Sequence, residues 1–488
     1  MGKVLIIGSG FSGMSAAAFM AKSGHQVVVL EKNEGPGGRA GVWEKGGFKF
    51  DMGPSWYWMP DVFERFFESF GKKVEDYYQL ERLDPSYRVY FEKDEFDVPA
   101  SFEELGNRFE ILEPGAKAKL DKFLKEAKIK YEVGMQDLVR KPGLSFTEYI
   151  DPRVFKGLGS LHLLKDMRSY VQKSFKHPQI KAILEFPVLF LGERPQKTPA
   201  LYSLMNYADL VLGTWYPKGG MHEISKAMMK LCQELGVDFK FKKEVVSLEG
   251  EGKKLSKAIL KNGDILEFDL VISGADYNHT DQELLPKGKQ NYSKKYWESR
   301  SMAPGSILYF LGVNKRIPKL LHHNLFFDTD FDQHANDIYE NPNWTQNPLF
   351  YACCPSKTDQ AVAPDGMENL FILIPTAPGK ADSAAVREEY FNKVMNRLED
   401  RTGTSLRNHI VVRRDFGFHD FKSRYHSFKG NAYGLANTLK QTGFLKPSIK
   451  SKSFENLFFT GQLTVPGPGV PPSLISGELV AKEAGKIL

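Results

Sequence analysis

The first thirty residues follow the order strand, glycine-rich turn, helix, strand. The apolar, β-branched run Lys3–Ile7 is typical of a strand buried on both faces of a parallel sheet. Three glycines follow in the spacing G-x-G-x-x-G, then a small-residue segment that favours a helix, and then a second apolar run, Gln26–Leu30, which ends at Glu31. This complete order, more than the glycine motif alone, predicts a βαβ unit that binds a dinucleotide.

Each residue of this unit has a physical reason for its place. Gly8 makes the tight turn out of the first strand, Gly10 lets the backbone approach a pyrophosphate, and Gly13 lets the helix pack closely on the sheet. The helix N-terminus offers free N–H groups to the phosphates, and Glu31 can accept hydrogen bonds from ribose hydroxyls. We therefore predict cofactor contacts from Gly8, Ser9, Gly10, Ser12, Gly13 and Glu31.

The segment after Glu31 distinguishes FAD from a nicotinamide cofactor. Lys32 is followed by a glycine-rich turn that ends in Gly38 and Arg39, in the pattern E-K-x-x-x-x-G-G-R. This stretch resembles one found in the amine oxidase and carotenoid desaturase flavoproteins, and a dehydrogenase that binds nicotinamide alone would have no need of it. The alternative is an unrelated surface turn. The pattern favours FAD.

The C-terminal end repeats the same local design. A second buried strand, Asn456–Gly461, runs into a turn rich in glycine and proline, and a small-residue helix follows over Ser473–Lys486. Such a turn can aim backbone N–H groups at the N1/C2=O edge of a reduced flavin, which carries negative charge. The alternative is a C-terminal helix that simply closes the sheet.

Four segments, in order along the chain, resemble those of the bacterial-type phytoene desaturases. They are Phe48–Ser55, which follows F-x-F-D-x-G-P-S, Trp215–Met221, which follows W-x-P-x-G-G, Leu270–Asp276, a strand that ends in S-x-A-D, and Asn456–Gly477. Gln462 and Val465 depart from the family pattern, because many members have small residues and His or Gln at these positions.

This resemblance implies an α/β fold with a Rossmann-like, glutathione-reductase-type FAD domain made of noncontiguous pieces. The pieces are residues 1–85, 215–290 and 440–488, and a mixed α+β substrate domain is inserted as residues 86–214 and 291–439. The β-rich runs within 239–260 fit the second piece. Further cofactor contacts are implied for Lys32, Gly38, Arg39, Gly53, Pro54, Ser55, Val245, Gly461, Gln462, Gly469 and Val470.

The middle of the chain is expected to shape the substrate site. Aromatic residues make up 13% of the sequence, which makes a wide apolar cavity plausible. The aromatic patch Trp56–Met59 and the apolar runs Leu184–Leu191 and Leu201–Leu212 are predicted to line an apolar tunnel beside the flavin. Glu185 and Asp209 lie within these runs and are our candidate catalytic acids, although single buried acids are more often structural.

Two observations bear on location. Gly157–Lys176 has apolar residues at helical spacing with basic residues beside them, which favours either a helix lying on a membrane surface or an ordinary core-facing helix. No stretch reaches the ~18 apolar residues of a spanning helix. With no secretory signal and only three cysteines, the sequence predicts a cytoplasmic protein, peripheral on the inner face of the cell membrane.

Several classes of site are not supported by the sequence. The net charge of +6, without a basic run interleaved with aromatic residues, does not suggest nucleic-acid binding. The cysteines have no zinc spacing, and the acidic run from Asp328 lacks the glycine of a calcium loop, because Gln333 takes that place. His322 and His323, with His334, have no ligand-like spacing, so we expect histidines in solvated loops and no metal.

The implied reaction removes two hydrogens from an allylic C–C bond of a lipophilic polyene, with hydride passing to flavin N5 and a proton to a base or water. Phytoene, desaturated stepwise toward lycopene, is the first candidate, with oxygen or a membrane quinone as electron acceptor. The alternatives are another carotenoid desaturase, a carotenoid isomerase, an amine oxidase, or a non-catalytic lipid-binding partner of small GTPases. The intact glycines and Glu31 argue against the last.

Overall fold

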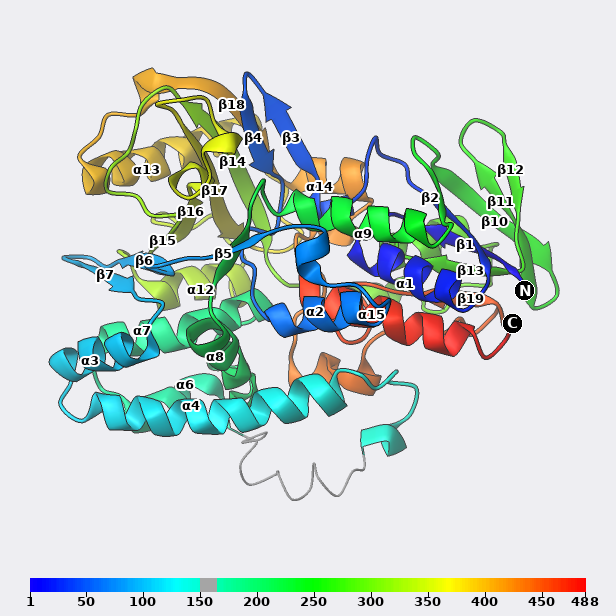
Figure 1. Cartoon of the computed structure of the whole chain (residues 1–488), viewed down its shortest axis with the longest axis horizontal. Coiled ribbons are helices and arrows are strands. Elements are labelled where there is room, and N and C mark those ends of the chain that lie inside the picture. The colour runs from blue at the N-terminus through cyan, green and yellow to red at the C-terminus, as the bar shows by residue number, and fades with distance from the viewer. Residues whose placement is uncertain (150–164) are drawn as a thin grey trace.

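The computed structural model describes residues 1–149 and 165–488. Figure 1 shows two β-sheets beside each other and a layer of helices beneath one of them. The sheet near the termini is parallel, and the other is mixed. This arrangement confirms the predicted α/β class with an inserted α+β region.

The parallel sheet contains both apolar runs of the N-terminal unit. Its strand order is β19-β13-β1-β2-β9, and every neighbouring pair is parallel. The strands come from the three chain segments that the sequence assigned to cofactor binding. Their bounds are β1 (Lys3–Ile7), β2 (Gln26–Leu30), β9 (Asp238–Lys240), β13 (Leu270–Ser273) and β19 (Leu457–Phe459).

The first and last long helices of the chain lie side by side against this sheet, as the blue and red ribbons of Figure 1 show. They are α1 (Phe11–Lys22) and α15 (Val470–Ala484). Gly477 permits the close contact, because a Cβ built there would lie 2.4 Å from the backbone oxygen of Ser12. Ser15 also donates a hydrogen bond of 2.7 Å to the carbonyl of Leu474. The two ends of the chain therefore form one structural unit.

Smaller elements complete the cofactor-binding region. A three-stranded antiparallel sheet, the predicted β-rich segment, follows β9. Two short ribbons, β3–β4 and β5–β8, lie where the chain passes toward the second sheet. The bounds are α2 (Pro60–Glu68), α9 (His222–Glu234), α10 (Tyr277–His279), α11 (Lys294–Glu298), β3 (Val42–Lys45), β4 (Phe48–Asp51), β5 (Leu80–Arg82), β8 (Trp215–Pro217), β10 (Val245–Glu251), β11 (Lys254–Leu260) and β12 (Ile265–Glu267).

The second sheet has seven strands in the order β18-β14-β17-β16-β15-β6-β7, antiparallel except between β15 and β6. One face packs with α13 (Ala384–Thr402) around a separate apolar core that includes Tyr309 and Leu398. The strands and remaining helices of this region are β6 (Tyr87–Tyr90), β7 (Glu95–Val98), β14 (Gly305–Val313), β15 (His323–Phe326), β16 (Phe350–Cys353), β17 (Glu368–Thr376), β18 (Ile410–Phe416), α12 (Phe331–Tyr339) and α14 (Phe418–Tyr425).

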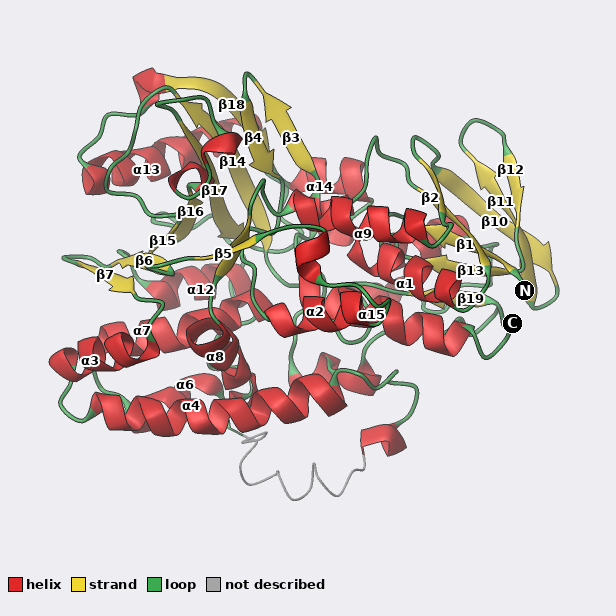
Figure 2. Ribbon diagram, viewed as in Figure 1, coloured by secondary structure: helices red, strands yellow, loops and turns green. Residues whose placement is uncertain are grey.

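The helical layer, red in the lower left of Figure 2, comprises α3 (Phe102–Leu112), α4 (Ala116–Val133), α6 (Met167–Ser174), α7 (Pro178–Glu185) and α8 (Leu204–Tyr207). The first part of the proposed surface helix, up to residue 164, lies outside the described residues. From Met167 onward its apolar residues, including Val171 and Phe175, are buried. In the described part of this helix, the apolar face therefore packs into the protein core. Within the described ranges, no helix has both the length and the apolar character needed to cross a bilayer.

Candidate active site

A cavity of about 510 Å³ lies between the two sheets and takes lining residues from both. This volume is in the range of cofactor and ligand sites. Glycines and charged groups of the parallel-sheet unit line one end, and aromatic and aliphatic side chains line the other. The two halves of the cavity therefore suit different chemical groups.

Glu31 occupies the nucleotide end, where the β2 strand stops. It is buried, and Oε2 accepts hydrogen bonds of 2.9 Å from both the backbone N–H and the hydroxyl of Ser9. Oε1 accepts from the backbone N–H of Asn33 at 2.8 Å. The carboxylate is therefore held at the cavity wall, while Ser9 lies behind it and does not line the cavity.

The three motif glycines meet different surroundings. Gly8 has a φ of +93°, a conformation that L side chains rarely adopt. A Cβ on Gly13 would lie 2.1 Å from the backbone oxygen of Gly8, so this glycine is needed for the contact of helix with strand. A Cβ on Gly10 would meet no protein atom within 4 Å, and Gly10 lines the cavity. The open space in front of Gly10 is where a pyrophosphate would lie.

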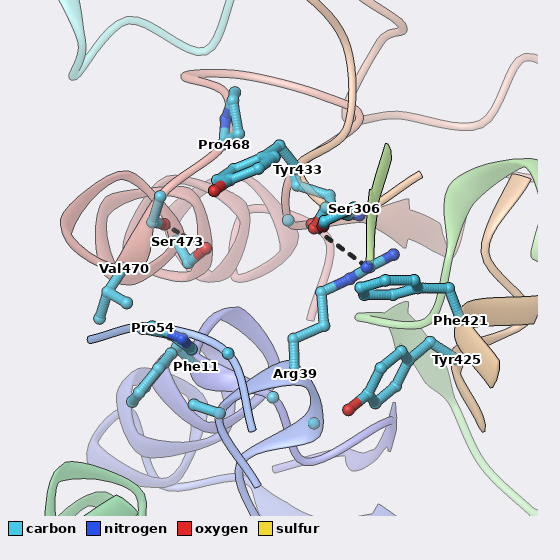
Figure 3. Close-up of a pocket in the computed structure, with 18 of the residues that line it drawn as sticks. Phe11, Arg39, Pro54, Ser306, Phe421, Tyr425, Tyr433, Pro468, Val470 and Ser473 are labelled. Carbon is cyan, nitrogen blue, oxygen red and sulfur yellow. Dashed lines mark hydrogen bonds between the residues drawn. The ribbon is translucent and has the colours of Figure 1, made fainter. Parts of the chain in front are cut away.

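Arg39 extends from the Gly38 turn and joins it to a distant loop. Its guanidinium donates hydrogen bonds to the carbonyls of Asn431 (2.8 Å) and Ala432 (3.1 Å) and to the hydroxyl of Ser427 (3.0 Å). Figure 3 shows it beside the rings of Phe421 and Tyr425, the latter with its centroid 5.2 Å away. Burial lowers the pKa of Arg39, and nearby Asp276 opposes this shift.

The C-terminal turn completes the cofactor end. Gly461, Gln462, Gly469 and Val470 all line the cavity, and Figure 3 places Val470 and Pro468 across from Phe11 and Pro54. The Ser476 hydroxyl accepts a hydrogen bond of 3.0 Å from the backbone N–H of Gly461. The loop thus closes over the same space that the N-terminal motif opens.

These residues fit FAD. Neither α1 nor α15 has a side-chain cap at its N-terminus, so α1 presents free N–H groups near the cavity, whereas α15, with Pro471 and Pro472 in its first turn, offers only those of Gly469 and Val470. The wall also carries Gly10, with open space in front of it, and the carboxylate of Glu31, which is placed to accept hydrogen bonds from a ribose. Of the predicted cofactor residues, those on the wall are Gly8, Gly10, Ser12, Glu31, Lys32, Gly38, Arg39, Gly53, Pro54, Ser55, Val245, Gly461, Gln462, Gly469 and Val470.

The other end of the cavity is apolar and aromatic. Trp56, Trp58 and Met59 line it together with Phe186, Leu189 and Met205 from the two predicted apolar runs. Tyr57 points elsewhere, and its hydroxyl lies 3.0 Å from that of Tyr78. In the described part of the chain, the carboxylates on the wall are Glu31, Glu244 and Asp276, which belong to the nucleotide end. The apolar end therefore offers no carboxylate from the described residues.

Asp209 lies outside the wall, one layer behind it. It is 1% exposed and accepts hydrogen bonds from the Tyr87 hydroxyl at 2.8 Å and the Thr214 hydroxyl at 3.2 Å. The Thr214 oxygen in turn accepts from the indole N–H of Trp58 at 2.8 Å. Burial raises the pKa of Asp209 to about 7. The carboxyl supports a wall residue and does not reach the cavity.

Glu185 also lies outside the wall, at the end of α7. Its Oε2 lies 3.0 Å from Nε of Arg168, which also pairs with Asp332 at 2.7 Å. Burial raises the pKa of Glu185, and Arg168 opposes the shift. The geometry gives this acid an ion-pair role between α7, α6 and α12.

Sequence patterns missed the wall residues that the second sheet and its loops contribute. Ser306 and Leu308 of β14, Tyr351 of β16 and Tyr433 all line the cavity. Alternation along β14 sends these two even-numbered residues to the cavity, while Ile307 and its odd-numbered neighbours face the other core. That alternation could have been read from the sequence, but the strand's position over the flavin site could not.

The prediction of solvated histidines is wrong. His322 is 4% exposed, His323 is 0% exposed and His334 is 3% exposed. His323 opens strand β15, which lies inside the seven-stranded sheet, and His334 lines the cavity from α12. The pair was misassigned because burial here comes from neighbouring strands that are distant in sequence.

Comparison with known proteins places this geometry in context. The family model of flavin-containing amine oxidoreductases matches residues 11–484. The chain is 42% identical to a carotenoid 3,4-desaturase of Haloarcula japonica, over 98% of this chain and 97% of that one. It is 33% identical to a zeta-carotene-forming phytoene desaturase of Myxococcus xanthus, over 98% and 93%. An oxidoreductase structure from Methanosarcina mazei, 15% identical, shares the fold with a TM-score of 0.62 over 98% and 100%.

Proposed function

The chain belongs to the family of flavin-containing amine oxidoreductases, and we propose that it is an FAD-dependent carotenoid desaturase. One observation carries the proposal. A cavity joins a dinucleotide cradle to an apolar aromatic chamber that offers no carboxylate from the described residues. Such a chamber suits the apolar burial of a polyene, and the carotenoid desaturases among the relatives favour this substrate over an amine.

FAD, when bound, would supply the acceptor for the hydride released when one C–H bond of the substrate breaks. The chain's own part is to bind and orient. Gly10 and the N-terminus of α1 would hold the pyrophosphate, Glu31 the ribose, and the N–H groups of Gly469 and Val470 the flavin edge. We propose those predicted cofactor contacts that line the cavity, and the boundaries 1–85, 215–290 and 440–488, on this basis.

The aromatic chamber would position a substrate that has no polar group to hold. Burial contributes about 25 cal/mol per Å² of apolar surface, and the wall around Trp56, Trp58 and Phe186 supplies that surface and excludes water. Asp209 and Glu185 lie behind the wall, so we assign them structural roles. The substrate's second hydrogen would pass as a proton to a base other than these two acids, or to water.

Phytoene remains the first candidate substrate. This first place comes from the sequence motifs, whereas the identity of 42% to the carotenoid 3,4-desaturase, against 33% to the phytoene desaturase, favours the 3,4 bond of a carotenoid as the competing candidate. Expression in cells that accumulate phytoene, and separately in cells that accumulate lycopene, followed by pigment analysis, distinguishes them. A purified protein that takes up no FAD would overturn the cofactor assignment, and unchanged pigments in both hosts would overturn the substrate class.

We also propose peripheral contact with the inner face of the cell membrane, with oxygen or a membrane quinone taking the electrons. Leu144 is 40% exposed, and Phe444 and Leu445 are 38% and 42% exposed on a neighbouring loop. The loops touch, because a Cβ on Gly143 would lie 3.5 Å from the Gly443 carbonyl. Such exposed apolar side chains suit insertion between lipid headgroups.

Sedimentation with vesicles of anionic lipid tests this contact. Phe444→Asp should release the protein from the vesicles, because a carboxylate replaces an inserted ring. Val411→Asp is the matched control, since Val411 is 53% exposed on β18 of the second sheet. Equal vesicle binding by both variants would rule out the Phe444 surface.

A further inference from the structure

Strands β15 and β16 bring three metal-ligating side chains together behind the cavity wall. His323 lies directly opposite Cys353 in the antiparallel register, and His322 precedes the strand. One ligand atom from each of the three residues lies within 4.8 Å of the other two, and all three residues are buried. A buried His-His-Cys cluster combines the nitrogen and sulfur ligands that zinc prefers.

The two imidazoles are oriented by one ring nitrogen each. Nδ1 of His322 lies 2.8 Å from the hydroxyl oxygen of Thr358, and Nδ1 of His323 lies 2.6 Å from that of Tyr351. Nε2 of both rings is buried and has no hydrogen-bond partner among the described residues. Ligating histidines are commonly fixed in this way, with the second nitrogen held by a neighbouring polar group.

The surroundings leave room for a small ion. A void of about 10 Å³, enough for one water-sized particle, is lined by two of the three residues, His322 and Cys353, and by Asp51 and Ser55, while His323 lies outside its lining. Cys353 Sγ lies 3.7 Å from Nδ1 of His323, the nitrogen that Tyr351 holds, so the thiol adjoins this imidazole, whose free nitrogen is Nε2. The distances among the three ligand atoms, which reach up to 4.8 Å, must shorten by about 1 Å through side-chain rotation for all three residues to bind one ion.

Burial also keeps both imidazoles in the form that binds metals. It lowers the pKa of His322 to about 3 and that of His323 further, so both are neutral at physiological pH. It raises the pKa of the Cys353 thiol, which would have to lose its proton to the solvent when a metal binds.

We propose that His322, His323 and Cys353 bind one Zn²⁺ ion, with a water in the void as its fourth ligand. The ion would fix β15 to β16 beneath Trp56, whose ring stacks on His323 at 4.0 Å. It would also steady the Tyr351 hydroxyl, which donates a hydrogen bond of 3.0 Å to Ser55 in the flavin-binding turn. This site is structural and independent of the proposed desaturation.

Metal analysis of the flavin-loaded protein, purified from zinc-supplemented cells, tests the proposal. We expect about one zinc per chain in the wild type, and a loss of most of it in Cys353→Ser and His322→Asn. Cys354→Ser is the matched control. Cys354 is the next residue and is equally buried, but its sulfur lies 3.4 Å from Glu368 and 3.5 Å from Ser356, away from the histidines. Zinc should stay at the wild-type level in this variant.

Cobalt supplies a second measurement that does not depend on the variants folding. Wild-type protein loaded with Co²⁺ should show the visible bands of a tetrahedral site, at longer wavelength than oxidised flavin, and a thiolate charge-transfer band. Zinc well below one per chain, together with an octahedral or absent cobalt spectrum, would overturn the proposal. So would full zinc retention in a folded Cys353→Ser protein. In those cases the void holds water alone.

Discussion

Two glycines of the N-terminal motif have different roles, Gly13 in folding and Gly10 in cofactor binding, and an alanine substitution at each position tests this difference. Gly13→Ala would place a methyl group 2.1 Å from the backbone oxygen of Gly8, where ordinary contacts begin near 3.4 Å. Neither group is the end of a flexible side chain, so helix α1 must move away from the sheet. Overpacking of this kind costs about 1–3 kcal/mol and sometimes more. We expect about 3 kcal/mol, even after the gain of about 1 kcal/mol in helix propensity.

Gly10→Ala should have the opposite effect on the apo-protein. Its Cβ meets no atom within 4 Å, and its φ of −71° suits any residue. The substitution should leave stability unchanged or raise it by about 0.4–1 kcal/mol, by restricting the unfolded chain. The same methyl group would occupy the pyrophosphate's place. We expect FAD affinity to fall at least a hundredfold, which corresponds to about 2.8 kcal/mol.

Urea unfolding of the apo-proteins gives the two stabilities, and titration with FAD, followed by flavin fluorescence, gives the two affinities. We expect Gly13→Ala to be less stable than the wild type, and Gly10→Ala to be stable but unable to hold FAD. Wild-type affinity in Gly10→Ala would refute the pyrophosphate assignment. Wild-type stability in Gly13→Ala would refute the packing argument.

Three further predictions follow from buried groups and close contacts. Burial holds the pKa of Asp209 at about 7, above its ordinary 3.8. Between these two pH values the folded state keeps a proton that the unfolded state has lost, so stability falls as pH rises. Asp209→Asn should therefore flatten this part of the curve of melting temperature against pH, while desaturation continues. Arg168→Met leaves a buried glutamate unpaired and should cost about 3–5 kcal/mol in chemical denaturation, whereas Asp332→Asn, at a side chain 58% exposed, should cost less than about 1. Gly477→Ala places a Cβ 2.4 Å from the α1 backbone and should lower both the melting temperature and FAD retention, and Gly485→Ala, whose nearest contact is 3.3 Å, should change neither.

The cofactor end was predictable because its determinants are local. A buried strand, glycines at fixed spacing and an acid at the next strand's end all fall within thirty residues, and each acts through backbone geometry. The C-terminal turn was recognisable for the same reason. The structure places Gly461 and Val470 on the same cavity wall as Gly10, a juxtaposition that the resemblance implied and the residues alone did not show.

The substrate end was less predictable because its contacts join distant segments. Asp209 lies in an apolar run that does line the cavity, yet one helical position decides whether a side chain faces the cavity or the layer behind it. His323 and Cys353 form a cross-strand pair thirty residues apart, a separation that no motif records. Position in the linear sequence gave no measure of burial for either residue.

The interleaving of distant segments in the parallel sheet has a consequence for synthesis on the ribosome. Strands β1 and β2 are made first, but β13 gains its second neighbour, β19, only after residue 457 has been added. Translation proceeds at about 5–20 residues per second, so an apolar strand edge waits on the order of ten seconds or more for its partner. During that interval the nascent chain carries a half-built nucleotide cradle, and FAD can bind securely only after β19 and α15 have been added. Chaperone supply and free flavin at that stage should therefore govern the yield of active protein.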